Sequence, residues 1–180
     1  KNPTASLAIN NSLIRDAALT QTVTVTYDEA MNPATSPTIK FFKSPYAGAD
    51  ETTSNFSAPA GVWSGGNTVW TRTFTHDGTA QEFPTVRVQV ANASGATDVA
   101  GNTDLGANSS TFAIDTKNPT ATVTRSNALV RDAALTQTVT VTYSEAMEGP
   151  TTPTIKIFKS PYAGADEILA AGRIDAVEAR

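Results

Sequence analysis

Acidic and amide side chains gather where two similar stretches of this 180-residue chain meet. Residues 112–120 carry Asp115 and Asn118 just before a proline, and residues 117–120 repeat the first four residues of the chain, 1–4. Carboxylate, amide and backbone carbonyl oxygens are the ligands that Ca²⁺ prefers, roughly six to eight of them at a time. This stretch therefore suggests a short, stiff, metal-bound joint between two domains.

A second copy of the first part of the chain begins at residue 117. Residues 1–51 and 117–167 align without a gap at an offset of 116, with 38 identities in 51 positions. A period of this length is typical of tandem domains rather than of a solenoid. We therefore expect a complete domain over 1–116, the N-terminal part of a second copy over 117–167, and a non-repeat tail over 168–180.

Threonine and valine alternate in both copies, which is typical of β-strands with one buried and one wet face. Residues 10–18 and 91–110 are expected to be polar loops. The strands of the first copy are expected at residues 5–9, 19–27, 38–43, 61–64, 68–76 and 86–90 and around Phe112 and Ile114. Seven strands in about 115 residues predict an all-β, two-sheet sandwich, and the second copy contains the first three of them.

The loops of such a sandwich alternate between its two ends, so that side chains far apart in the sequence meet. The loops after strands one, three and five are expected at the exit of the first domain, which places Asp16 and Asp77 near Asp115. The loop after the second strand of the next copy brings Glu145 to the same joint as Asn118. These five residues together predict an oxygen cage for Ca²⁺.

Glu29 and Asp98 hold the corresponding places at the entry to the first domain. Without a preceding domain, that metal site is expected to be empty or half-built. The alternative for all of these residues is that Asp and Asn cap turns, because their side chains bond nearby backbone amides. For the Asp98 loop both interpretations stay open, whereas for Asp115 with Glu145 a role at the joint is favoured.

Three motifs in fixed order characterise the chain. Val-Thr-Tyr-x-Glu-Ala-Met occurs at 25–31 and 141–147, Thr-Asp-Val-Ala-Gly-Asn at 97–102, and Phe-x-x-Asp-Thr-x-x-Pro-Thr at 112–120. Together they resemble the bacterial immunoglobulin-like domain that is repeated in large surface adhesins and biofilm proteins. The resemblance covers the first domain from end to end and the first half of the second.

This resemblance implies a seven-stranded immunoglobulin-like sandwich and export to the bacterial cell surface. In several such families it also implies Ca²⁺ at the domain joints. The partners would then be neighbouring repeats of the same chain. The expected function is that of a stalk, which extends and stiffens an adhesin and holds a distal binding module away from the cell.

Composition argues against several other functions. The net charge is −4 and the basic residues are scattered, which argues against nucleic acid. No apolar run approaches the roughly 18 residues of a membrane span. The absence of cysteine removes disulfides, structural zinc and thiol catalysis.

Catalysis is not expected. Adjacent acids such as Asp28 and Glu29 point apart and rarely share a site. The single histidine, His76, is expected to be an exposed residue at a strand end. Nucleophile-elbow, P-loop and dinucleotide motifs are missing from the sequence, so we do not expect an enzyme.

Two alternatives to the stalk remain open. One is a carbohydrate-binding or other adhesive module, in which Trp63, Trp70, Tyr46 and Phe42 would form a flat platform. The two tryptophans flank a hairpin signal, however, and are expected to pack in the core or across strands. The other alternative is an accessory domain of a secreted enzyme.

The second copy is expected to leave an apolar face and open strand edges. We therefore expect residues 121–180 to be poorly packed, swapped with another chain in a dimer, or docked on a partner. The tail over 168–180 has apolar residues at helical spacing. It is either a sequence introduced by cloning or a shifted reading frame, or a helix that covers the half-sandwich.

Overall fold

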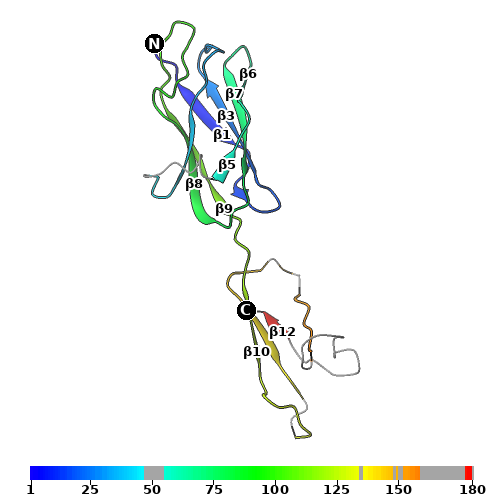
Figure 1. Cartoon of the computed structure of the whole chain (residues 1–180). Helices are drawn as coiled ribbons and strands as arrows, with labels where there is room; N and C mark the ends of the chain where they lie inside the picture. The colour runs from blue at the N-terminus through cyan, green and yellow to red at the C-terminus, as the bar shows by residue number, and fades with distance from the viewer. Residues whose placement is uncertain (47–54, 134–135, 148, 150–151, 159–176, 180) are drawn as a thin grey trace. The chain divides into compact units, whose positions relative to one another are not determined.

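The computed structural model describes residues 1–46, 55–133, 136–147, 149, 152–158 and 177–179. The chain is all-β and divides into two units, Lys1–Lys117 and Asn118–Arg180, shown in Figure 1. The boundary lies within one residue of the predicted domain boundary.

The first sheet of unit 1 is built around β3 (Thr20–Tyr27). Its strand order is β1 (Ala5–Ile9), β3, β7 (Val69–His76) and β5 (Phe56–Ser57), and β6 (Val62–Ser64) also pairs with β7. All of these pairs are antiparallel. The residues of β3 alternate between buried and more exposed positions, as its Thr-Val pattern predicts.

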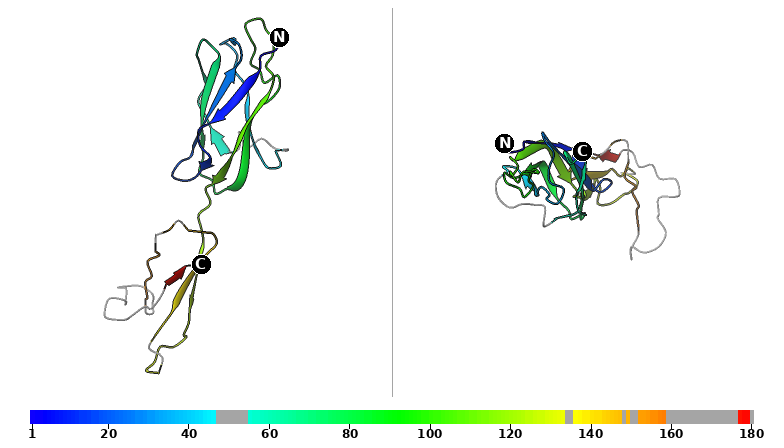
Figure 2. Two further views of the ribbon diagram at one scale, coloured as in Figure 1. Left: turned by 180° about the vertical axis from the view of Figure 1, so that it is seen from behind. Right: turned by 90° about the horizontal axis from the view of Figure 1, so that it is seen from above.

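The second sheet of unit 1 has four strands. They are arranged in the order β2 (Leu13–Ile14), β9 (Ala107–Asp115), β8 (Glu82–Val90) and β4 (Ile39–Lys43). β2 runs parallel to β9, and the other pairs are antiparallel. The strands of both sheets run along the long axis of unit 1 (Figures 1 and 2).

An aromatic cluster joins the two sheets. Phe41 of β4 is fully buried and stacks on Phe56 of β5, with ring centroids 4.6 Å apart. It also meets Phe74 of β7 edge-on at 5.0 Å and Phe112 of β9 at 5.9 Å. Aromatic pairs in these geometries stabilise a core beyond the area that they bury. The two sheets therefore enclose one core in a sandwich-like arrangement.

Two loop predictions for unit 1 were wrong. Residues 10–18 contain β2, because Ile14 is fully buried and pairs with Ile114 in the second sheet. The predicted loop over 91–110 ends early, because β9 already begins at Ala107, opposite Val90. With β2 and β5 added, the described part of unit 1 has nine strands rather than the seven expected.

Unit 2 repeats the beginning of unit 1. β10 (Ala121–Arg125) pairs with β11 (Val139–Tyr143), and Ala121 lies opposite Tyr143 just as Ala5 lies opposite Tyr27. β11 repeats the end of β3, whereas β10 shares only its first residue with β1, so the same strand register forms although the first strands differ in sequence.

A glutamine side chain fixes this register in each unit. In unit 1, Asn11 N donates to Gln21 Oε1 at 2.9 Å, and Gln21 Nε2 donates to Asn11 O at 2.8 Å. In unit 2, Asn127 and Gln137 make the same two bonds at 3.0 and 2.9 Å. We call these two bonds the glutamine clamp. It joins residues only ten positions apart in the sequence, so it forms locally in each unit.

The rest of unit 2 departs from the prediction. Residues 155–158 match the first four residues of β4 except at Ile157, but they are not in a strand. In unit 1, β4 pairs with β8, and residues 118–158 contain no copy of the β8 sequence. The helix considered for the tail is wrong for the described residues of that tail, which form β12 (Val177–Ala179) parallel to β11. The remainder of 168–180 lies outside the described residues.

Candidate functional site

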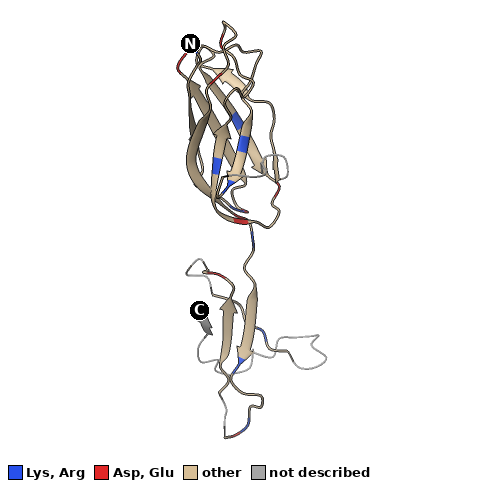
Figure 3. Ribbon diagram, turned by 90° about the vertical axis from the view of Figure 1, so that its left-hand side faces the viewer, with Lys and Arg blue, Asp and Glu red and all other residues tan. Residues whose placement is uncertain are grey.

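The acids predicted at the exit of unit 1 do lie at one end of it. Asp77 directly follows β7, and Asp16 lies in the turn before β3, whose first residue Thr20 is paired with Thr75 of β7. Asp115 ends β9, next to β2. Figure 3 shows the described acidic residues of unit 1 toward its two ends. The three residues thus belong to the same end of the two sheets.

Their side chains are engaged locally. Asp77 Oδ1 accepts a hydrogen bond from Thr79 N at 2.9 Å, and this bond lowers the pKa of Asp77. Asp16 is exposed. Asp115 is half-buried opposite Glu82 of β8, whose carboxylate accepts from Lys117 Nζ at 3.2 Å. These contacts are those of a turn cap and a surface ion pair.

The described residues of unit 1 do not form a cage of three acids. Among the described residues, no three acidic or histidine side chains lie close enough to share a metal ion. Asn118 is exposed and Glu145 is half-buried, and both belong to unit 2. Calcium at the joint therefore stays a prediction.

At the entry end, Asp98 caps its own loop. Its carboxylate is buried and accepts from Asn102 N and Asn102 Nδ2, both at 2.8 Å. The Asn102 amide lowers the pKa of Asp98. Met31 forms a bridge with Asp98, which joins this loop to the one that holds Glu29. One Glu29 oxygen, Oε1, is buried without a hydrogen-bond partner. The turn-capping interpretation thus accounts for Asp98, but not for Glu29.

A hydroxyl that the sequence did not single out anchors the chain as it leaves unit 1. Thr116 is buried, and its Oγ1 donates to Thr79 O at 2.6 Å and accepts from Gln81 N at 3.0 Å. Thr116 N also donates to Gln81 O at 2.9 Å. We call this group of three residues the exit clamp.

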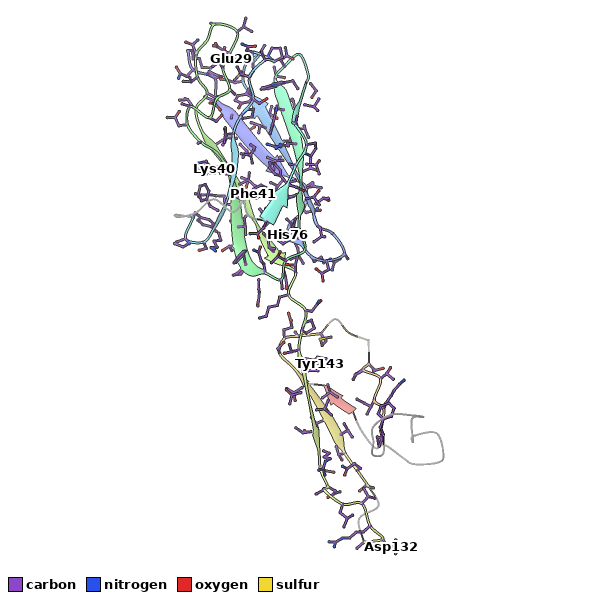
Figure 4. All side chains as sticks on the ribbon, viewed as in Figure 1. Glu29, Lys40, Phe41, His76, Asp132 and Tyr143 are labelled. Carbon is purple, nitrogen blue, oxygen red and sulfur yellow. The ribbon has the colours of Figure 1, made fainter. Side chains whose placement is uncertain are left out.

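His76 supports the exit clamp from inside, and its predicted exposure was wrong. Its ring is 1% exposed and meets Gln81 Oε1 through Nε2 at 3.0 Å. Gly78 N donates to the other ring nitrogen, Nδ1, at 3.1 Å. Because Nδ1 accepts from Gly78 N, Nε2 is the ring nitrogen that can donate to Gln81 Oε1. His76 therefore packs inside the β7–β8 turn, at the opposite end of unit 1 from Glu29 (Figure 4).

Asp28 anchors the chain as it enters unit 1. Thr4 N donates to Asp28 Oδ1 at 2.8 Å, and Asp28 N donates to Thr4 O at 3.1 Å. Lys1 makes an ion pair with the same carboxylate. In unit 2 the corresponding residue is Ser144, which exchanges bonds of 3.0 and 2.9 Å with Thr120. We call each of these pairs an entry clamp.

A buried polar network supports the entry of unit 1. Asp104 is fully buried and accepts from Tyr27 Oη at 3.1 Å and from the Ser94 hydroxyl at 2.8 Å. Burial and the Asp104 charge raise the pKa of Tyr27. The next residue, Leu105, donates its amide to Pro3 O at 2.9 Å. The network therefore fixes the loop that holds the entering chain.

The two clamps leave a very short link. Thr116 is held within unit 1 and Thr120 within unit 2, so only residues 117–119 lie between them. The four steps along the chain from Thr116 to Thr120 span at most about 14 Å when fully extended. Pro119 also fixes its own φ and restricts the residue before it.

The tryptophans serve packing. Trp70 is 1% exposed and lies opposite Trp63 in the β6–β7 pair. Trp63 is half-buried, packs on Tyr27 with centroids 5.8 Å apart and donates Nε1 to Thr35 O at 2.8 Å. An exposed aromatic platform that includes these two rings is therefore not supported.

A scan against protein-family models and a search of curated proteins gave no match to this chain. Among the described residues, no helix is long and apolar enough to cross a membrane.

Replacing Thr116 by valine tests the exit clamp. The change keeps the side-chain volume but leaves Gln81 N and Thr79 O without their partner, so we expect a loss of about 1–3 kcal/mol in unfolding free energy. Urea denaturation followed by tryptophan fluorescence measures it in unit 1, which holds both tryptophans. The control is Thr111→Val on the exposed side of β9, with an expected effect within about 0.5 kcal/mol. Equal effects would contradict the assignment.

The entry clamp of unit 1 predicts a pH dependence. The Lys1 ammonium and the Thr4 amide lower the pKa of Asp28 from 3.8 to about 2. A lowered pKa means that the carboxylate stabilises the fold above about pH 4 and that this contribution disappears as the pH falls toward 2. We therefore expect the difference in urea midpoint between wild type and Asp28→Asn to be largest at pH 6 and to vanish near pH 2. A difference that is constant from pH 6 to pH 2 would contradict this.

Proposed function

We propose that the chain is a structural extender, a piece of tandem immunoglobulin-like sandwiches that forms the stalk of a bacterial surface adhesin. The observation that carries the proposal is the three-residue link between an exit clamp and an entry clamp. A link this short restricts the independent motion of two folded units. The proposal gives the chain a mechanical role and no catalytic one.

The construction of unit 1 suits such a role. The chain enters beside Asp28 and leaves at Thr116, at opposite ends of the sheets. β9 is nine residues long and runs directly into the exit clamp, so that it spans about 30 Å. Both attachment points are tied by hydrogen bonds to neighbouring loops. The packed tryptophans favour a stalk over a sugar-binding module.

Calcium is a separate part of the proposal. Asp16, Asp77 and Asp115 gather at the exit end, and Asn118 and Glu145 are expected to complete the site from the next unit. A bound cation would neutralise carboxylates that otherwise repel one another and would further restrict the link.

Lengthening the link tests the stalk role. We expect insertion of Gly-Ser-Gly-Ser between Lys117 and Asn118 to broaden the distribution of distances between the two units. The chain has no cysteine, so spin labels at Thr111→Cys and Thr122→Cys report one distance by pulsed electron resonance. The same insertion after Gly66, in an open hairpin of unit 1, is the control and should leave the distribution narrow. A wild-type distribution as broad as that of the lengthened link would refute the proposal.

Calcium is tested by thermal unfolding with and without a chelator. If the joint binds Ca²⁺, millimolar Ca²⁺ raises the melting temperature of the wild type, because a ligand of the folded state stabilises it. Asp115→Ala should abolish the rise, whereas Asp132→Ala, an exposed acid of unit 2, should preserve it. No response of the wild type, or equal responses of the two variants, would remove calcium from the proposal and leave the link untouched.

A further inference from the structure

The outer face of the second sheet of unit 1 carries basic and aromatic side chains that the stalk does not use. Lys40 and Phe42 of β4 and Arg87 of β8 are half-buried, whereas the residues next to them along the strands that face inward are buried in the core. Because side chains alternate along a strand, these three point outward. Phe42 pairs with Arg87 across the two strands, and Lys40 pairs with Gln89, so the three side chains share one patch.

Tyr46 fixes the position of Arg87. It lies in the turn after β4, where its amide donates to Lys43 O at 2.7 Å. Its φ of 63° is in the left-handed region, which is uncommon for a bulky residue and is often found at functional sites. The Arg87 guanidinium lies over the Tyr46 ring, with Cζ 4.5 Å from the ring centroid, and this cation–π contact holds it in place. We call Lys40, Phe42, Tyr46 and Arg87 the basic face.

The positive charges of the basic face are not neutralised by the described part of the chain. Among the described residues, no ion pair includes Lys40 or Arg87. Arg87 Nε is also buried without a hydrogen-bond partner. Figure 3 shows Lys and Arg within the strands of unit 1, and Lys40 lies between Glu29 and His76 along the unit (Figure 4). A partly desolvated guanidinium without a counter-charge favours the arrival of an anion.

A polysaccharide that carries carboxylates suits this combination of side chains. The Arg87 guanidinium is shaped to bind a carboxylate through two parallel hydrogen bonds. Phe42, its cross-strand neighbour, offers an apolar ring to the C–H face of a sugar. Lys40 is two residues along β4, about 7 Å away, where it can meet a second carboxylate. Beside Lys40, Gln89 Nε2 donates to Asn108 Oδ1 at 3.1 Å, and this amide pair adds neutral groups that can bond hydroxyls.

Nucleic acid suits the basic face less well. Double-stranded DNA carries one charge per roughly 1.7 Å, and its binding relies on many phosphate contacts. The described residues of this face offer only Lys40 and Arg87 as cations, and the chain has a net charge of −4. The more sparsely charged polymer with sugar faces is therefore the better ligand.

We propose that the basic face binds linear polysaccharides that carry carboxylates. Arg87 binds a carboxylate, Phe42 packs against a sugar ring, and Lys40 meets a further carboxylate along the polymer. Tyr46 is a positioning residue that orients Arg87. This binding activity goes beyond the stalk and does not depend on it.

The experiment uses the full chain and a fluorescently labelled oligogalacturonate. Anisotropy should show saturable binding that weakens as the salt concentration rises. The methyl-esterified form of the same oligosaccharide should bind at least about tenfold more weakly, because it offers no charged acceptor to Arg87. In isotope-labelled protein, amide shifts should move in β4 (Ile39–Lys43) and β8 (Glu82–Val90).

Two charge changes locate the site. Arg87→Gln should weaken binding by about tenfold, because the charge-assisted hydrogen bonds are lost. Arg15→Gln removes the same charge from an exposed position at the exit end and should leave the affinity unchanged. Urea denaturation followed by tryptophan fluorescence checks that unit 1 is folded in both variants.

A pair of changes at Tyr46 tests its positioning role. Tyr46→Phe keeps the ring under Arg87 and should retain the wild-type affinity, whereas Tyr46→Ala removes the ring and should weaken binding. The proposal would be overturned by equal binding of the charged and esterified oligosaccharides, by equal affinities of the two glutamine variants, or by amide shifts that leave β4 and β8 unmoved. Tighter binding of a DNA oligomer of equal charge would also overturn it.

Discussion

The structure depends on strands that come much later in the chain, because they cover the core side chains of β3 in one sheet and of β4 in the other. Val25 of β3 and Phe41 of β4 are fully buried because β7 and β9 bring Trp70, Phe74 and Phe112 against them. Burial of this apolar surface is the main favourable term in folding. Once the two sheets close on each other, the loops at both ends of the sandwich are positioned, and so are the two clamps.

The two clamps hold the chain where it enters and where it leaves unit 1. The Thr116 hydroxyl satisfies two backbone groups of the β7–β8 turn, and His76 fills the space beneath them. Buried polar groups that are fully paired fix one arrangement, because any other leaves a donor or acceptor unsatisfied. At the entry, Asp28 and Ser144 make equivalent bonds with different charges. The geometry is therefore retained between units, whereas the electrostatics are not.

The strand predictions were most accurate where apolar and polar residues alternate with the two-residue period of a β-strand. β1 was predicted with its observed bounds, and β3 within a residue, because their side chains alternate. β2 was missed because two residues, Leu13 and Ile14, show no period, and the start of β9 was missed because residues 107–110 are mostly polar. The alternation of loops predicts at which end of unit 1 the acidic loops lie. It does not predict the buried roles of Thr116 and His76, because burial of a single polar side chain is set by tertiary packing.

Comparison of the two copies distinguishes structure that local sequence determines from structure that requires pairing with distant strands. β11 has the sequence of β3, forms the same register with its neighbour and carries the same glutamine clamp. Yet residues 155–158, which match the first four residues of β4 in all but one position, do not form a strand. The hairpin-like pair is thus a local product, whereas the second sheet exists only through long-range pairing. Loop-closure entropy must be overcome before such long-range pairing lowers the free energy, which explains why the Thr-Val pattern alone does not determine the second sheet.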